Sequence, residues 1–234
     1  MTRIITLIAL SLTLAATPAA WAADEHHHGD HAPAATAPTG HEGHGAHQMA
    51  SPEEMQKRML RWMPKAESKV GARLDPKLSF IDGAGKKRTL GEFFDKPLFV
   101  TFVFATCPHI CPTIAANLAA RVEKAGKEGK GGFRTLVISF DTATDSAAGM
   151  KGYAAGFRDN PDFIGGVAEA SSVGALTEAF GFSYMPHPTE VWAHITMITA
   201  VDTGGVVVRQ IFGTKVPSDE FAETVDGLLT PGGK

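Results

Sequence analysis

Apolar and polar positions change period repeatedly along residues 78–229, and each change marks an expected strand or helix. Residues 97–104 form a nearly continuous apolar and β-branched run, which predicts a strand buried on both faces. A helix over 113–124, capped at Gly126, is predicted from apolar side chains that recur every fourth residue: Ile110, Ile114, Leu118 and Val122. Similar patterns predict the remaining elements, which are strands over 78–83, 133–140, 162–168, 192–201 and 206–212, a short helical turn over 88–94, and helices over 146–157, 173–180 and 218–229.

The order of these elements predicts the fold class. Strands alternate with helices, and the chain closes with a hairpin that turns at residues 202–205 and a last helix capped by Ser218. This order is typical of an α/β domain with a central sheet flanked by helices. Period-two alternation along 192–201 also predicts that one face of a single strand carries four side chains: Trp192, His194, Thr196 and Ile198.

Composition excludes two broad classes of protein. The 22 basic and 25 acidic residues give a formal net charge of −3, whereas a general nucleic-acid binder carries a strong basic excess. Hydrophobic residues make up 44% of the chain, which is enough apolar material for a core. Two cysteines are too few for a disulfide-rich scaffold.

The first 22 residues have the pattern of an export signal. A positive start, Met1-Thr2-Arg3, precedes an apolar run over 4–16, and Ala20-Trp21-Ala22 fits a small-x-small cleavage site. The alternative is a retained anchor, but the apolar run is shorter than the roughly 20 residues that span a bilayer. We therefore expect a cleaved signal peptide, no permanent membrane span afterwards, and a periplasmic or otherwise exported location.

Residues 23–50 predict a disordered, histidine-rich tail. They contain almost no large apolar side chains, and seven of the ten histidines of the chain lie there: His26, His27, His28, His31, His41, His44 and His47. Clustered imidazoles suit Cu, Ni and Zn, so metal capture and a merely soluble linker are the two readings left open. Residues 51–65 follow as an expected helical lead-in, with methionines at helical spacing that could instead form a copper ladder: Met55, Met59 and Met63. The folded domain is expected over 66–234.

Both cysteines lie in one motif, residues 106–113, between a predicted buried strand and a predicted helix. Helix N-terminal amides carry partial positive charge, so Cys107 and Cys111 are expected to lose protons readily, and Pro112 fits the first helical position. A spacing of four places two sulfurs close enough to share an ion. Structural zinc usually needs four ligands, whereas soft thiolates with one imidazole suit copper. A structural disulfide across so short a loop is the alternative, although it gains little chain entropy.

Three segments resemble the Sco/SenC family of thioredoxin-fold copper proteins. Residues 99–112 match its strand followed by a CPxxCP-type motif, 137–145 resemble its next strand and Asp-x-x-x-Asp segment, and 192–213 resemble its histidine-bearing hairpin. The resemblance covers roughly residues 66–230. It implies a thioredoxin-like mixed sheet and one copper ion, as Cu(I) with Cu(II) left open, held by Cys107, Cys111 and His194.

The resemblance also implies a function. Family members deliver copper to the CuA centre of cytochrome c oxidase or prepare its thiols, so the implied role is an exported metallochaperone. The implied partner is a copper acceptor such as oxidase subunit II. No residue in this sequence identifies that acceptor.

Several residues near the motif keep alternatives open. His109, where the family commonly has an acidic or neutral residue, is a redox-tuning group, a surface residue or a fourth ligand. Thr142 stands where the family often has a proline. Asp141 is a candidate for a group that lies near the metal without binding it, and Asp145 is the expected N-cap of the helix over 146–157. His187 is a turn residue or a transient copper contact.

Two other functions compete with copper delivery. A periplasmic thiol–disulfide oxidoreductase would use the same cysteine pair on partner cysteines. Against it, thioredoxin-type exchangers have two residues between their cysteines, where this chain has three, and a cis-proline where this chain has Ala193-His194. In the third reading, a generic metal buffer, the tail alone binds metal and the domain is a scaffold.

Overall fold

The computed structural model describes residues 64–187 and 191–230. The chain divides into two compact units, 1–48 and 49–234, and every described residue belongs to the second. The expected signal peptide, the histidine-rich tail and nearly all of the helical lead-in lie outside the described residues, so those assignments remain predictions. Within the described ranges, no helix combines the length and apolar character needed to cross a membrane.

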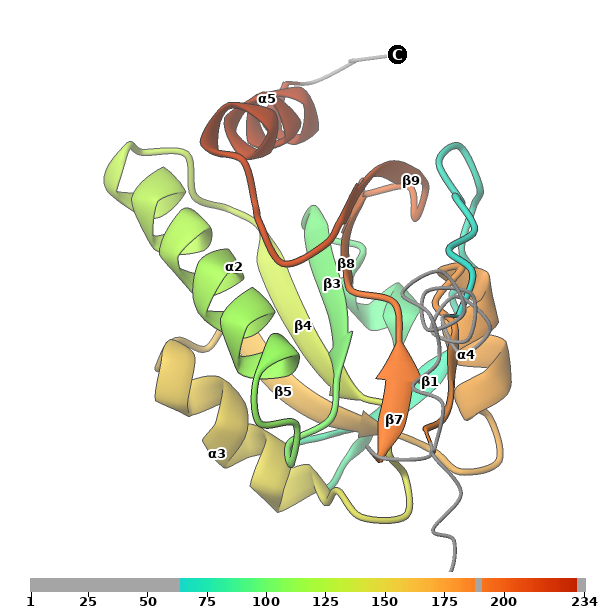
Figure 1. Cartoon of the computed structure of the whole chain (residues 1–234). Helices are drawn as coiled ribbons and strands as arrows, with labels where there is room; N and C mark the ends of the chain where they lie inside the picture. The colour runs from blue at the N-terminus through green and yellow to red at the C-terminus, as the bar shows by residue number, and fades with distance from the viewer. Residues whose placement is uncertain (1–63, 188–190, 231–234) are drawn as a thin grey trace, which may run out of the picture. The chain divides into compact units, whose positions relative to one another are not determined.

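A seven-stranded mixed sheet forms the centre of the domain, in the order β2-β1-β5-β4-β3-β8-β9 (Figure 1). Strands β3, β4 and β5 run parallel to one another, and the other neighbours pair antiparallel. The bounds are β1 Ser79–Asp82, β2 Lys87–Thr89, β3 Leu98–Val103, β4 Arg134–Ser139, β5 Phe163–Ala168, β8 Met197–Val201 and β9 Val207–Phe212. The predicted α/β class with a central mixed sheet flanked by helices is confirmed.

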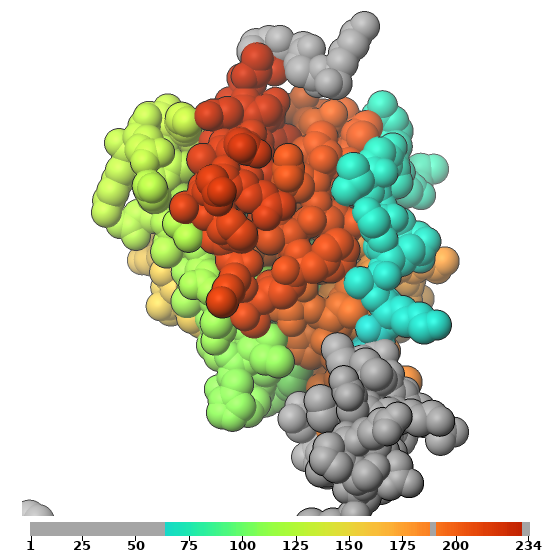
Figure 2. Space-filling view, turned by 45° about the horizontal axis from the view of Figure 1, so that its top comes forward, coloured from blue at the N-terminus to red at the C-terminus, as the bar shows by residue number. Residues whose placement is uncertain are grey.

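Helices cover both faces of this sheet. Their bounds are η1 Leu90–Phe93, α2 Ile110–Lys127, α3 Ala147–Phe157, α4 Val173–Ala179 and α5 Ser218–Leu229. Phe99 and Phe102 are three residues apart in β3, so their side chains point to opposite faces of the sheet. The ring of Phe99 stacks on Phe221 of α5, whereas the ring of Phe102 contacts Phe180, directly after α4. Helices α5 and α4 therefore lie on opposite faces. Helix α2 contacts both α3 and α5, and Figure 2 shows α5 (red) beside the end of α2 (yellow-green).

Strand β3 is the centre of the core and leads directly to the cysteine motif. All six of its residues are buried, as the uninterrupted apolar run predicts. Its one polar side chain, Thr101, donates from Oγ1 to the Met197 carbonyl of β8 at 2.9 Å, so its burial leaves no unpaired hydroxyl. Buried on both faces and paired on both edges, β3 is a rigid base for the loop that follows.

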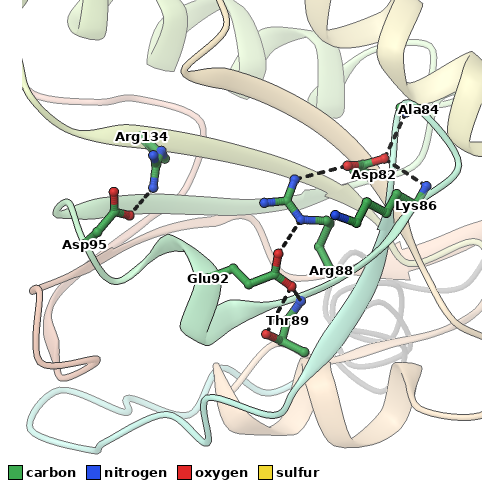
Figure 3. A network of polar contacts seen from close by, with 8 residues as sticks. All are labelled: Asp82, Ala84, Lys86, Arg88, Thr89, Glu92, Asp95 and Arg134. Atoms are coloured by element: carbon green, nitrogen blue, oxygen red, sulfur yellow. Dashed lines mark hydrogen bonds and ion pairs between the residues drawn. The ribbon is translucent and has the colours of Figure 1, made fainter.

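The edge hairpin β1–β2 is joined to η1 by a network of charged side chains (Figure 3). Arg88 donates to Glu92 at 2.7 Å and to Asp82 at 3.3 Å, and the Thr89 amide donates to Glu92 at 2.8 Å. The Thr89 amide, followed by the Arg88 guanidinium, lowers the pKa of Glu92 to about 2. These contacts fix the short turn η1 against the hairpin.

Several predicted helix and strand boundaries are wrong, and a local hydrogen bond explains the one at the start of α3. Helix α2 begins at Ile110, so Pro112 is its third residue, and it extends past Gly126 to Lys127. Ser146, not Asp145, caps α3 by accepting the Gly149 amide at 3.1 Å. The N-cap of α5 is Pro217, and Ser218 is already helical. Part of the short helical turn expected over 88–94 is strand, namely β2.

The largest departure is at residues 184–201. The single strand expected over 192–201 is two strands, β7 Trp192–His194 and β8. Strand β7 pairs with β6, Tyr184–Pro186, in a separate two-stranded sheet, where His194 faces Tyr184. Because β7 and β8 belong to different sheets, the predicted shared face of His194 with Thr196 and Ile198 is wrong.

Candidate metal centre

Two distant segments bring Cys107, Cys111 and His194 together. The cysteines lie at the exit of β3 and the first turn of α2, and the histidine ends β7. One ligand atom from each residue lies within 4.8 Å of the other two, and Cys111 Sγ is 3.6 Å from His194 Nε2. The three residues that the sequence singled out as metal ligands therefore lie close enough together that one ion could contact all of them.

The backbone of the motif shapes the positions of both sulfurs. The Cys111 amide lies 3.4 Å from Cys107 Sγ, and the Phe104 amide lies 3.4 Å from Cys111 Sγ, so each sulfur accepts one backbone hydrogen bond. Both cysteines are free thiols, which does not match the alternative of a structural disulfide. Cys111 is buried and Cys107 is half-buried, so Cys107 is the more exposed of the two residues.

The pKa of the Cys111 thiol is raised, whereas its position at a helix N-terminus predicts a lowered pKa. Burial raises the pKa of Cys111, the Phe104 amide lowers it, and negative charge at Cys107 raises it again. Desolvation therefore changes the pKa more than the hydrogen bond from the Phe104 amide does, and the expectation that Cys111 is easily deprotonated is wrong. A soft metal ion arriving here has to displace a proton.

Asp145 holds the loop that carries the cysteines. Its Oδ2 accepts the Ala105 amide at 2.8 Å and the Ser139 hydroxyl at 2.6 Å. The first bond fixes the backbone two residues before Cys107, and the second ties the same carboxylate to the end of β4. The residue expected to cap a helix is thus a positioning residue for the motif.

His194 is oriented by its own backbone neighbour. Its Nδ1 lies 2.7 Å from the carbonyl oxygen of Ile195, and since a carbonyl only accepts, Nδ1 carries the hydrogen. In the neutral ring this leaves the Nε2 lone pair directed towards the Cys111 sulfur. This arrangement, with one ring nitrogen fixed by a carbonyl and the other facing thiols, is typical of a metal-binding histidine.

An aromatic cluster surrounds the histidine, and the sequence analysis did not find it. The rings of Phe104, Phe140 and Phe182 lie 5.5–6.0 Å from the His194 ring, centroid to centroid. Tyr184 and Trp192 extend the cluster, each in ring contact with Phe140. The members come from four separate segments, so no periodicity in the sequence joins them. They form an apolar wall on the histidine side of the candidate site.

The other predicted residues do not join the group of three. His109 is exposed at the N-cap of α2, where its carbonyl accepts the Thr113 hydroxyl at 2.7 Å. Asp141 is buried, its Oδ1 accepts the Thr144 amide at 3.3 Å, and its Oδ2 has no hydrogen-bond partner within the described part of the chain. His187 is half-buried beyond β6 and is not part of the group.

The fold and the site define a thioredoxin-like protein with a Cys₂His group at the end of a central strand. Residues 66–230 match the SCO1/SenC family, and the chain belongs to that family. The resemblance seen in the sequence is confirmed. No curated protein matches the chain.

Solved structures share this fold at low sequence identity. ScoI of Arabidopsis thaliana with copper bound is 22% identical, covering 67% of this chain and 95% of its own, with a TM-score of 0.58. ScoI of Bradyrhizobium japonicum with copper bound is 22% identical, covering 68% and 99%, with a TM-score of 0.57. Yeast Sco1 with copper bound is 21% identical, covering 71% and 92%, also with a TM-score of 0.57.

Proposed function

We propose that this protein is an exported metallochaperone that binds one copper ion through Cys107, Cys111 and His194. The observation that carries the proposal is the convergence of two sulfurs and one imidazole nitrogen within 4.8 Å. Two thiolates and an imidazole suit Cu(I), and the same set accommodates Cu(II). Within the described residues the group has three members, one short of the four that structural zinc prefers.

Further facts support copper as the cargo and its handover to a second protein. The chain belongs to the SCO1/SenC family, and the related ScoI and Sco1 structures hold copper. Cys107 is half-buried and is the more exposed of the two cysteines, which favours handover of an ion from its side of the site. The exposed side chain of Ile110, which precedes Cys111, offers apolar contact area to that protein.

The acceptor follows from the family resemblance. We infer delivery of copper to the CuA site of a cytochrome c oxidase subunit II, or preparation of its thiols. The pattern of residues 1–22 supports export, which would place the protein in the same compartment as such a site. Metal captured by the histidines of 26–47 would add a local supply of copper.

An anaerobic Cu(I) competition titration tests the binding claim. We expect the reduced protein that starts at Ser51 to bind one equivalent of Cu(I) tightly. The affinity should fall about 100-fold or more in Cys107→Ser and in His194→Ala, because loss of a ligand weakens metal binding more than loss of a residue that only supports a ligand. His187→Ala is the matched control, because this described histidine lies outside the group of three. Unchanged affinity in both ligand variants would refute the proposed site.

A thiol–disulfide oxidoreductase is the second candidate. It is favoured by the two free thiols and by the hydrogen bond that the half-buried Cys107 accepts at its sulfur from the Cys111 amide. The raised pKa of Cys111 and the three intervening residues count against it. Turnover of disulfide substrates by metal-free protein, lost in Cys107→Ser, would establish this activity. A disulfide potential far below that of the compartment, with no turnover, would exclude it.

A further inference from the structure

The histidine of the candidate site lies on a hairpin outside the central sheet. His194 ends β7, and β6 and β7 form a two-stranded sheet of their own. Within the described part of the chain, no ladder of backbone hydrogen bonds therefore joins the hairpin to the strand that carries the cysteine motif. The Ile195 carbonyl orients the imidazole, but it comes from the next residue and does not tie the hairpin to the cysteines.

One buried phenylalanine connects this hairpin to the central sheet. Phe140 directly follows β4, its amide donates to the Val103 carbonyl of β3 at 3.1 Å, and its side chain is 2% exposed. Centroid to centroid, its ring lies 4.6 Å from Tyr184, 5.9 Å from Trp192 and 5.5 Å from His194. A side chain fixed on the central sheet thus contacts both strands of the hairpin and the histidine itself.

The other rings beside the histidine do not make this connection. The ring of Phe104 lies 5.6 Å from His194, but among the described ring contacts it reaches no other residue of the hairpin. Phe182 lies 6.0 Å from both Tyr184 and His194, but it comes two residues before β6 and enters the hairpin with it. Phe140 is therefore the contact through which the central sheet can hold both hairpin strands.

These contacts place the imidazole before an ion arrives. Aromatic rings at such separations attract one another and bury apolar area, so they favour one position of the hairpin. In that position His194 Nε2 lies 3.6 Å from Cys111 Sγ. Residues that hold a metal ligand in place typically change metal affinity 10–100-fold when they are replaced.

We propose that Phe140 is a positioning residue for the third copper ligand. Its ring holds the β6–β7 hairpin against the central sheet and so keeps the His194 imidazole within reach of an ion bound by the two sulfurs. The inference rests on the proposed copper site. It assigns Phe140 an effect on the oxidation state as well, because thiolates select Cu(I) whereas Cu(II) favours nitrogen ligands. A displaced imidazole therefore weakens Cu(II) binding more than Cu(I) binding.

The test compares Phe140→Leu with Phe133→Leu in the full chain. The two phenylalanines are buried at opposite ends of β4, but the ring of Phe133 contacts Phe99, at 5.2 Å, and is not in ring contact with His194. We expect Phe140→Leu to weaken Cu(I) binding about 10-fold against a chelator and Cu(II) binding about 100-fold. The tenfold difference corresponds to a rise of about 59 mV in the copper reduction potential. Phe133→Leu should lower the melting temperature similarly and change neither affinity.

Two spectra separate positioning from general destabilisation. The sulfur-to-copper charge-transfer band follows Cu(II) at the domain site, because the two cysteines of the chain both lie in the motif. X-ray absorption of the Cu(I) form should keep two sulfur ligands in Phe140→Leu and lose nitrogen. Tyr184→Leu removes the hairpin ring that lies 4.6 Å from Phe140 and leaves the central sheet intact, so it should shift the same properties in the same direction.

Three results would overturn the inference. Wild-type copper affinities and spectra in Phe140→Leu and in Tyr184→Leu, with binding still lost in Cys107→Ser, would make the ring a packing residue and leave the copper site standing. Equal losses of copper affinity in Phe140→Leu and Phe133→Leu would assign the effect to general destabilisation. Copper binding that is insensitive to Cys107→Ser and to His194→Ala would reject the proposed site and the inference together.

Discussion

At the scale of single residues, the cysteine loop depends on side chains that are not themselves ligands. The Asp145 carboxylate pairs the Ala105 amide and the Ser139 hydroxyl, and the Ile195 carbonyl fixes the His194 ring. Such partners determine where the ligand atoms lie before an ion arrives. The position of Cys107 therefore rests on Asp145, 38 residues later in the chain.

Replacing Asp145 tests this dependence. In Asp145→Ala the partly buried Ala105 amide and Ser139 hydroxyl lose their acceptor, so we expect a loss of about 1–3 kcal/mol in unfolding free energy. We also expect copper affinity to fall about 10-fold as the loop loosens. Urea unfolding and Cu(I) competition measure the two effects. Asp159→Ala, at an exposed carboxylate, is the control, and an equal effect there would contradict the argument.

Glu92 predicts a pH dependence of stability. Its pKa is about 2 in the folded protein and 4.5 ordinarily, so its contribution is present above pH 4.5 and is lost as the pH falls towards 2. Glu92→Gln should remove this part of the acid destabilisation and lower stability at neutral pH. Thermal unfolding of both proteins between these pH values measures it. Glu223→Gln, on the exposed side of α5, should keep the wild-type profile, and the same change there would contradict the assignment.

At the scale of elements, close contact between α3 and β5 requires a glycine. A Cβ at Gly165 would overlap the Met150 carbonyl of α3 and lie 3.0 Å from the Ala154 side chain. The backbone carbonyl cannot move without shifting the helix. The absence of a side chain at this position thus sets the distance between α3 and the sheet.

Gly165→Ala should therefore destabilise the domain, by about 1–3 kcal/mol, because the added methyl overpacks the interface. The matched control is Gly152→Ala in α3, where a Cβ meets nothing within 4 Å. That change should stabilise the helix by about 0.5–1 kcal/mol. Urea unfolding of both variants gives the comparison. Destabilisation of equal size at both positions would show that the close contact is not the cause.

The elements also show what the sequence could predict. Strands β3 and β4 are long apolar runs, and α2 has a clear four-residue period, so each was predicted from local pattern alone. Strands β6 and β7 have three residues each and pair with each other in a two-stranded sheet, so no local pattern separates them from a loop or from β8. Helix starts and caps depend on single hydrogen bonds, which periodicity does not report.

The site itself was predictable only in part. The cysteine motif is local, whereas His194 lies 83 residues after Cys111 and was identified through the family resemblance. Burial of Cys111 and the aromatic wall around His194 arise from tertiary packing. Neither of these leaves a spacing in the sequence that could be read in advance.

At the scale of the whole molecule, the account assigns different roles to the tail and the domain. The full chain should bind more copper than the chain starting at Ser51, because seven histidines lie within 26–47. The additional ions should be held more weakly than the one in the domain. Equilibrium dialysis at increasing competitor concentration measures both populations.

Fusing the tail to an unrelated carrier protein tests the metal-buffer function. Under that function, metal resistance would transfer with the tail.

The most direct test of the central claim is the copper X-ray absorption spectrum of the reduced full chain loaded with one equivalent of Cu(I). The account predicts two sulfur ligands and one imidazole nitrogen, from Cys107, Cys111 and His194. Loss of the sulfur contribution in Cys107→Ser would confirm the assignment. A first coordination shell of nitrogen alone would place the ion on the histidine tail and contradict a Cys₂His copper site.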